Sequence, residues 1–297
     1  MRKKAILILL LLASLLGLSF CSLTPRVKTE PDVIFVTTPH RVVREMLKLA
    51  EVKKDDVVYD LGSGDGRIVI AAARDFGARA VGIEIDQNLI NESTENARKA
   101  GVAERTSFRK EDIFEADIHE ATVVTLFLLP GVNQMLIPKL FKDLQPGTRI
   151  VSHRFDMGDW KPDVSLRGYG SDVYLWYIPA QVDGDWNIVV YREKGLWRHT
   201  WRFHQIYQVV RGTDAEKKAV FKNVDLYGKD IDMVVEDNSI GFGSVMELSG
   251  HVNGDTMEGT AVVKDSHSAG EYLWKGVRAK NGSSADAGTS AEGRGGS

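Results

Sequence analysis

Apolar and polar positions follow two different patterns along the chain. From about residue 38 to residue 180, short apolar runs alternate with segments of helical spacing. The run at 121–130 is apolar throughout, which is typical of a parallel strand buried on both faces. The pattern predicts strands within 56–62, 78–86, 105–117, 121–130, 148–155 and 171–180, and helices within 38–52, 66–77, 87–101 and 131–147.

This alternation of strands and helices predicts an α/β fold with a doubly wound, mostly parallel sheet. Gly77 and Gly101 are expected to end the second and third helices. Thr38 is expected to cap the first helix, with Pro39 in its first turn.

The pattern changes after about residue 181. Short alternating runs are broken there by Gly, Asp and Asn, and a helix is suggested only near 214–219. Residues 181–279 are therefore expected to form a small antiparallel β domain, either a sandwich or a barrel. Its aromatic residues are expected to form its core, with a ligand cavity as the alternative: Trp186, Trp197, Trp201, Tyr207 and Trp274. Residues 280–297 are rich in Gly, Ser and Ala, which predicts a disordered tail.

Residues 1–22 have the pattern of a leader. Three basic residues at 2–4 precede an apolar run that ends near Cys21, as in a secretory signal peptide or a membrane anchor. Residues 18–21 resemble a lipoprotein cleavage box with Cys21 as the lipidated residue, although the bulky Phe20 departs from that pattern. Lipidation, cleavage nearby and an uncleaved anchor all stay open. Residues 23–34 are polar and contain two prolines, which predicts a linker.

The leader predicts a membrane-associated or exported protein of the bacterial cell envelope. Composition adds two exclusions. The formal net charge is −3 with scattered basic residues, which gives no indication of a nucleic-acid partner. A single cysteine excludes an internal disulfide and a cysteine-type zinc site, and no metal site is expected.

The stretch "VVYDLGSGDGRIVIAAA" at 57–73 places a glycine-rich turn between a strand and a helix. Such a turn directs backbone N–H groups and the positive end of the helix toward a ligand. NAD sites use a related turn, whereas a phosphate-binding P-loop is excluded because no Gly-Lys-Ser/Thr follows. Asp60 and Asp65 would repel a pyrophosphate, and they suit a ligand that carries an amine or a sulfonium. S-adenosylmethionine carries both.

Further acidic residues follow the next two expected strands. Glu84 lies about twenty residues after the turn, where a carboxylate can accept hydrogen bonds from both ribose hydroxyls. Asp112 could accept from the adenine amino group, with the Ile113 backbone facing the ring. Acids at three successive strand ends are typical of methyltransferases. The expected cofactor-binding residues are Asp60, Gly62, Ser63, Gly64, Asp65, Gly66, Glu84, Ile85, Asp112 and Ile113.

The same residues carry a family resemblance. "VVYDLGSGDGRIVIAAA" and "VGIEID" resemble the first two motifs of class I S-adenosylmethionine-dependent methyltransferases. "FVTTPHRVVREML", "LFLLPGVNQMLIPKL" and "RIVSHRFDMGDW" resemble lysine methyltransferases related to the mitochondrial ATP synthase c-subunit enzyme, and more closely its bacterial relatives. The resemblance covers about 33–180. It implies a Rossmann-like methyltransferase domain over 35–180, with cofactor contacts at Asp60, Gly62, Gly64, Glu84 and Asp112.

The acceptor side is less defined. The expected fourth strand ends in "TLFLLPG" and lacks the Asn/Asp-Pro-Pro-aromatic pattern that DNA adenine methyltransferases use to hold an exocyclic amine. His153 is either a polar group at the mouth of the site or a structural histidine, and the same alternatives hold for His40. No catalytic residue is assigned. The substrate-side candidates are Pro39, His40, Leu128, Leu129 and Pro130, with strand-end core as the alternative for the leucines and Pro130.

Three functions remain open from the sequence. The first is methylation of a protein lysine, and the second is methylation of a small molecule or a lipid cradled by the β domain. The third is an exported binding protein that keeps the cofactor fold without the reaction. The leader motivates the third, since S-adenosylmethionine is made in the cytoplasm, whereas the three intact acids argue against it. The sequence predicts neither the acceptor nor the oligomeric state.

Overall fold

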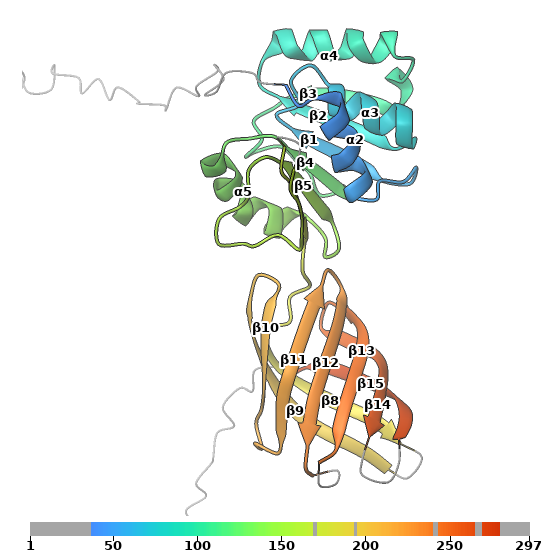
Figure 1. The fold of residues 1–297 in the computed structure, drawn as a ribbon, viewed down its shortest axis with the longest axis vertical. Helices are drawn as coiled ribbons and strands as arrows, with labels where there is room; N and C mark the ends of the chain where they lie inside the picture. Colours follow the sequence, from blue (N-terminus) through green and yellow to red (C-terminus); the bar gives the residue numbers. More distant parts are fainter. Residues whose placement is uncertain (1–36, 169–170, 193–194, 240–242, 265–268, 280–297) are drawn as a thin grey trace, which may run out of the picture. The chain divides into compact units, whose positions relative to one another are not determined.

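The computed structural model describes residues 37–168, 171–192, 195–239, 243–264 and 269–279 (Figure 1). The leader at 1–22 with Cys21, the linker at 23–34 and the tail at 280–297 lie outside the described residues. In the ranges that are described, no helix is both long and apolar enough to cross a membrane.

A seven-stranded sheet forms the first part of the described chain, with strand order β3-β2-β1-β4-β5-β7-β6. The first five strands in sequence are parallel, β7 runs antiparallel to β5, and β6 runs antiparallel to β7. The predicted α/β fold is therefore confirmed. The strands are β1 (Val57–Leu61), β2 (Arg79–Glu84), β3 (Thr106–Lys110), β4 (Val123–Leu126), β5 (Arg149–His153), β6 (Val164–Leu166) and β7 (Val173–Tyr177).

Helices cover both faces of this sheet, and alternate strand residues supply the two cores. Val58 packs with α2 (His40–Leu49) and α3 (Arg67–Phe76) on one face. The next residue, Tyr59, belongs to the core on the other face, which α5 (Pro130–Asp143) covers. α4 (Gln87–Lys99) and the short 3-10 helix η1 (Ala103–Arg105) lead into β3.

Chain order reverses between β1 and β4, which are neighbours in the sheet. In an open α/β sheet, a ligand binds beyond the carboxyl ends of the strands at such a switch point. The glycine-rich turn follows β1 directly, so the fold places it at this position. The same edge of the sheet carries the ends of β4 and β5.

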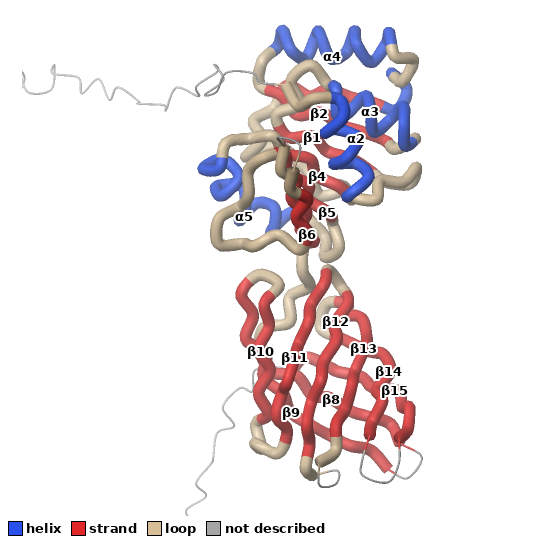
Figure 2. Tube along the Cα trace, viewed as in Figure 1, coloured by secondary structure: helices blue, strands red, loops and turns tan. Residues whose placement is uncertain are grey.

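Eight antiparallel strands form a closed barrel in the order β10-β11-β12-β13-β14-β15-β8-β9. Of the two predicted alternatives, the structure has the barrel (Figures 1 and 2). The strands are β8 (Gly184–Arg192), β9 (Gly195–Ile206), β10 (Val209–Asp214), β11 (Ala219–Tyr227), β12 (Asp230–Asp237), β13 (Val245–Asn253), β14 (Thr256–Lys264) and β15 (Ala269–Arg278).

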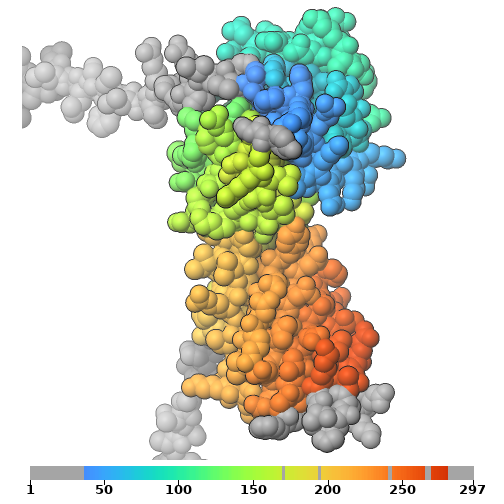
Figure 3. Space-filling model, viewed as in Figure 1, coloured from blue at the N-terminus to red at the C-terminus, as the bar shows by residue number. Residues whose placement is uncertain are grey.

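Large side chains fill the barrel. Trp186, Trp201 and Trp274 are buried in one apolar cluster, as predicted. Trp197 is half-buried at the margin of this cluster, and Tyr207 lies in the turn between β9 and β10. In the space-filling view the barrel wall is continuous on the face shown (Figure 3). Each strand pairs with two neighbours, which closes the sheet on itself and removes its edges.

Two local predictions are wrong. Thr38 does not cap α2: the N-cap residue is Pro39, no side chain caps the helix, and the Thr38 hydroxyl instead contacts His153. The suggested helix near 214–219 is a turn between β10 and β11. Asp214 accepts hydrogen bonds there from the backbone N–H groups of Lys218 and Ala219, and short acidic side chains favour turns by such bonds.

Candidate active site

The glycine-rich turn has the backbone conformation that its sequence predicts. Gly62, Gly64 and Gly66 have φ of 80°, 53° and 79°, in the left-handed region that glycine adopts without strain. Gly66 is the N-cap residue of α3, and no side chain caps that helix. A Cβ atom at Gly66 would lie 2.8 Å from Phe108 and from Ser93, so the turn also packs closely against β3 and α4. Among the first N–H groups of α3, that of Arg67 donates to Oδ1 of Asp65 at 3.2 Å, and those that follow are the groups with which a helix N-terminus binds an electronegative ligand.

Ser63, the turn residue between the first two glycines, faces inward. It is buried, and its hydroxyl has no partner among the described residues. The hydroxyl fills the space beside Gly82 of β2, where a Cβ atom would lie 2.5 Å from it. The Ser63 N–H donates to the Ile83 carbonyl at 3.0 Å, and the contact of Ser63 with the cofactor stays a prediction.

Asp60 lies at the end of β1 with 2% of its surface exposed. Its carboxyl accepts a hydrogen bond of 2.6 Å from the Thr125 hydroxyl on β4. Burial raises the pKa of Asp60 to about 7, and the nearby charges of Glu84 and Asp65 raise it further, against the effect of Thr125. A cationic group nearby would favour the ionised form.

Glu84 lies at the end of β2 and is also buried. One carboxylate oxygen accepts from the Gly64 N–H at 3.0 Å, and the other accepts from the N–H groups of Ile85 and Asp86 at 2.8 and 3.0 Å. This carboxylate therefore joins the glycine turn to the end of β2. Its position beside the turn fits the predicted hydrogen bonds to ribose hydroxyls.

Asp65 is not the free carboxylate that the sequence suggested. It forms a forked ion pair with Arg67, with Nε–Oδ1 and Nη2–Oδ2 distances of 2.9 and 2.5 Å. The pKa of Asp65 lies below its usual value because these bonds outweigh the effect of burial. Most of its charge is therefore neutralised within the turn. The argument that two free carboxylates select a cationic ligand holds for Asp60 alone.

Asp112 follows β3 and is exposed, and its carboxylate accepts from the Phe114 N–H at 2.9 Å. Ile113, the next residue, is half-buried. Ile85, directly after β2, is also half-buried. The acids predicted at three strand ends therefore lie at one edge of the sheet, after β1, β2 and β3. Their contacts with a cofactor stay a prediction.

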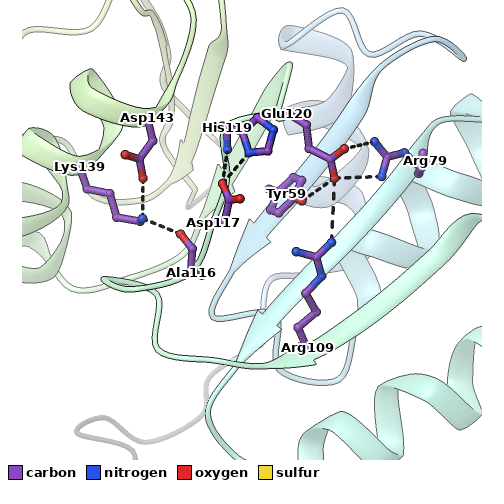
Figure 4. A network of polar contacts seen from close by, with 9 residues as sticks. All are labelled: Tyr59, Arg79, Arg109, Ala116, Asp117, His119, Glu120, Lys139 and Asp143. Atoms are coloured by element: carbon purple, nitrogen blue, oxygen red, sulfur yellow. Dashed lines mark hydrogen bonds and ion pairs between the residues drawn. The ribbon is translucent and has the colours of Figure 1, made fainter.

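The segment between β3 and β4 contains no helix, and polar contacts hold it against the sheet and α5 (Figure 4). Glu120 accepts from the Tyr59 hydroxyl at 2.7 Å and from Arg79 of β2 at 2.6 and 3.0 Å. Lys139 of α5 donates to the Ala116 carbonyl at 2.5 Å and pairs with Asp143 at 2.6 Å. These contacts fix the position of the segment that begins with Asp112.

The end of β4 lies next to the glycine turn. A Cβ atom at Gly62 would lie 2.9 Å from Leu128, so the leucine packs directly over the turn. Leu129 is 48% exposed and Pro130 is exposed at the start of α5. Of the apolar wall predicted at 128–130, Leu128 contacts the turn, while the other two residues line the surface.

The segment before α2, residues 37–39, contacts the same edge of the sheet. Arg67 donates to the Thr38 carbonyl at 2.9 Å, and the Thr38 hydroxyl lies 3.2 Å from Nδ1 of His153. Pro39 and His40 are exposed, as residues at the mouth of a site would be. His153, in contrast, lies at the end of β5 with only 4% of its surface exposed.

Sequence reasoning missed Arg67 and Thr125, which neutralise Asp65 and hydrogen-bond Asp60. Arg67 carries a local signal, since it stands two residues after an acid at the first position of a helix. Thr125 lies in an apolar run whose alignment with β1 no local pattern reveals. The structure otherwise fits S-adenosylmethionine, because the N-terminus of α3, the left-handed glycines and the three strand-end acids lie at one edge of the sheet.

The comparisons with known proteins agree with this geometry. The model of the ANTKMT methyltransferase domain matches residues 60–164. A protein-lysine N-methyltransferase of Saccharolobus islandicus is 52% identical over 153 residues, which cover 50% of this chain and 95% of that protein. This chain belongs to the ANTKMT methyltransferase family. It is therefore an S-adenosylmethionine-dependent methyltransferase, and the predicted family, activity and cofactor are confirmed.

Two further similar proteins carry other descriptions. The adenine nucleotide translocase lysine N-methyltransferase of Mus musculus is 35% identical over 147 residues, which cover 50% of this chain and 63% of that protein. A crystal structure described as an RNA methyltransferase from Salinibacter ruber in complex with S-adenosyl-L-homocysteine is 60% identical. It covers 50% of this chain and 96% of that chain, with a TM-score of 0.49.

Proposed function

We propose that this protein transfers the methyl group of S-adenosylmethionine to the side-chain amine of a protein lysine. The proposal is supported chiefly by the match over 95% of the length of the Saccharolobus islandicus protein-lysine N-methyltransferase. The absence of the Asn/Asp-Pro-Pro-aromatic pattern after β4 agrees with it, since that pattern serves nucleic-acid amines.

The bound cofactor supplies a methyl group on a sulfonium, a carbon already activated toward displacement. The protein then needs mainly to align an amine with that carbon and to keep the amine neutral. Asp60, Glu84 and the turn at 62–66 would hold the cofactor, as the family resemblance implies. Leu128 would form an apolar wall where β4 meets this turn.

We further propose that the leader places the protein at the bacterial cell envelope, where its acceptor would be a membrane or membrane-associated protein. A basic start and an apolar run to Cys21 support this location. A reporter fused after residue 35 tests it, because reporters that act only in the cytoplasm or only outside it report the side. Activity of the cytoplasmic reporter alone would reject export.

The acceptor can be found by incubating the full chain with cell extract and S-adenosylmethionine labelled in its methyl group. We expect the label in protein, as methylated lysine after acid hydrolysis. Label recovered in lipid, RNA or small molecules instead would reject the lysine proposal. This readout separates the open functions by the molecule that carries the methyl group.

A Glu84→Gln variant is the matched negative control for that labelling. Loss of the charged acceptor beside the glycine turn should weaken cofactor binding by about 1–3 kcal/mol. Titration calorimetry with S-adenosylhomocysteine measures the change, and Glu104→Gln, an exposed acid in η1, should bind as the wild type does. Equal affinity of the two variants would rule out the ribose role of Glu84.

A further inference from the structure

His153 is a buried histidine beside the cofactor turn whose role the family assignment leaves open. It ends β5 with 4% of its surface exposed, and its ring lies 4.3 Å from the Phe127 ring, centre to centre. Phe155, two residues after His153, stacks on Phe127 with 6.3 Å between the ring centres. The Phe127 ring therefore packs against the imidazole at the carboxyl edge of the sheet.

Two routes of direct contact connect His153 to the glycine turn. Along β4, Phe127 touches the imidazole and its neighbour Leu128 packs over Gly62. Along the segment before α2, the Thr38 hydroxyl touches the imidazole, and the Thr38 carbonyl accepts from Arg67. The histidine thus lies where β4, β5 and the segment before α2 meet beside the cofactor turn.

The surroundings of His153 favour its neutral form. Burial lowers its pKa from the usual value, and the positive charge of Arg154 lowers it further. The other charged groups on elements packed here are Arg67 with Asp65 across Thr38, and Asp172, whose carbonyl accepts from the Arg154 N–H. At neutral pH the ring is therefore unprotonated.

We propose that His153 is the general base that accepts a proton from the lysine ammonium, and that Thr38 is its positioning residue. The inference rests on the proposed lysine methylation. The Thr38 hydroxyl lies 3.2 Å from Nδ1 of His153. In the proposed tautomer Nδ1–H donates to this hydroxyl and Nε2 is the proton acceptor.

The step balances without a further reactant. The lysine ammonium transfers one proton to Nε2 of His153, which becomes an imidazolium. The neutral amine nitrogen forms a bond to the methyl carbon while the carbon–sulfur bond breaks, and S-adenosylhomocysteine leaves with the electron pair. The imidazolium returns its proton to solvent, and the product ammonium must lose a proton again before any second methyl transfer.

The test compares the pH dependence of kcat for the full chain and for His153→Gln. The acceptor is the protein labelled in the extract, with poly-L-lysine as a second probe. We expect the wild-type kcat to be level above about pH 7. At pH 7 the variant should fall by a factor of about 10²–10⁴, and its kcat should rise about tenfold per pH unit toward the lysine pKa of about 10.4.

Controls separate this role from a structural one. Binding of S-adenosylhomocysteine to His153→Gln should stay within about twofold of wild type. His119→Gln, an exposed histidine paired with Asp117, should keep the wild-type profile. Thr38→Val should lower kcat with a shifted pH profile, and Thr38→Ser should restore it. The two Thr38 variants also keep the inference testable if His153→Gln fails to fold.

A His153→Gln profile parallel to that of the wild type would overturn the base role and leave the lysine proposal standing. Thr38→Val with an unchanged profile would overturn the positioning role. A wild-type enzyme that labels no lysine in extract or in poly-L-lysine would overturn the proposed function together with this inference.

Discussion

At the residue scale, the site combines a carboxyl whose ionisation is costly with one that is already neutralised. Asp60 is buried and accepts one hydrogen bond, from Thr125. Asp65 is paired with Arg67 within the same turn. The sequence shows both acids but cannot show this difference, because it depends on which neighbours the fold brings to each side chain.

Asp60→Asn should therefore stabilise the cofactor-free protein at alkaline pH. The folded pKa of about 7 lies above the unfolded value, so the stability of the wild type falls as pH rises from about 4 to 7. The neutral amide avoids this loss. Urea unfolding should show the variant about 1–3 kcal/mol more stable at pH 8 and close to wild type at pH 4.5.

The same variant should bind S-adenosylhomocysteine more weakly, which calorimetry measures at pH 8. A destabilised variant at pH 8, or one whose advantage over the wild type does not change with pH, would contradict the raised pKa of Asp60. The pKa of His153 is also shifted, by burial, but this residue is present in both proteins and its effect cancels in the difference.

At the element scale, the sequence predicted where most strands and helices lie. It did not predict the contacts between distant residues that hold them in place. Residues 57–73 predict the strand, turn and helix as they occur, because local backbone preferences decide them. The strand expected at 121–130 is shorter, since Pro130 starts α5 and the preceding three residues lie between strand and helix. Thr38 has a capping residue type, yet it hydrogen-bonds His153, 115 positions later.

Lys139 of α5 connects the segment between β3 and β4 to that helix. Lys139→Met would leave the Ala116 carbonyl and the Asp143 carboxylate without their cation, at a cost of about 1–3 kcal/mol in unfolding free energy. Faster hydrogen exchange at residues 112–121 and several-fold weaker cofactor binding should accompany this loss. Lys142→Met, exposed on the same helix, is the matched control. Equal exchange in both variants would show that this contact does not hold the segment.

At the scale of the whole molecule, the chain has separate apolar cores, and the predicted cofactor residues lie outside the barrel. One cluster fills the barrel, whereas the clusters around β1 and β4 belong to the sheet. The sequence could predict this division because strand–helix alternation gives way to short alternating runs near residue 181. It could not choose barrel over sandwich, since closure depends on pairing between β8 and β15, which are far apart in sequence.

A substitution in the barrel core should therefore change stability without changing cofactor affinity. Trp274 is 1% exposed, and its indole N–H donates to the Ser249 carbonyl at 3.1 Å. Trp274→Ala should lower the unfolding free energy of the barrel by about 3–5 kcal/mol through lost burial and a cavity. S-adenosylhomocysteine at about 100 times its Kd should still stabilise the sheet by about 2.7 kcal/mol in this variant. Calorimetric melting with and without ligand measures both, and a tenfold loss of affinity in Trp274→Ala would show that the barrel contributes to the cofactor site.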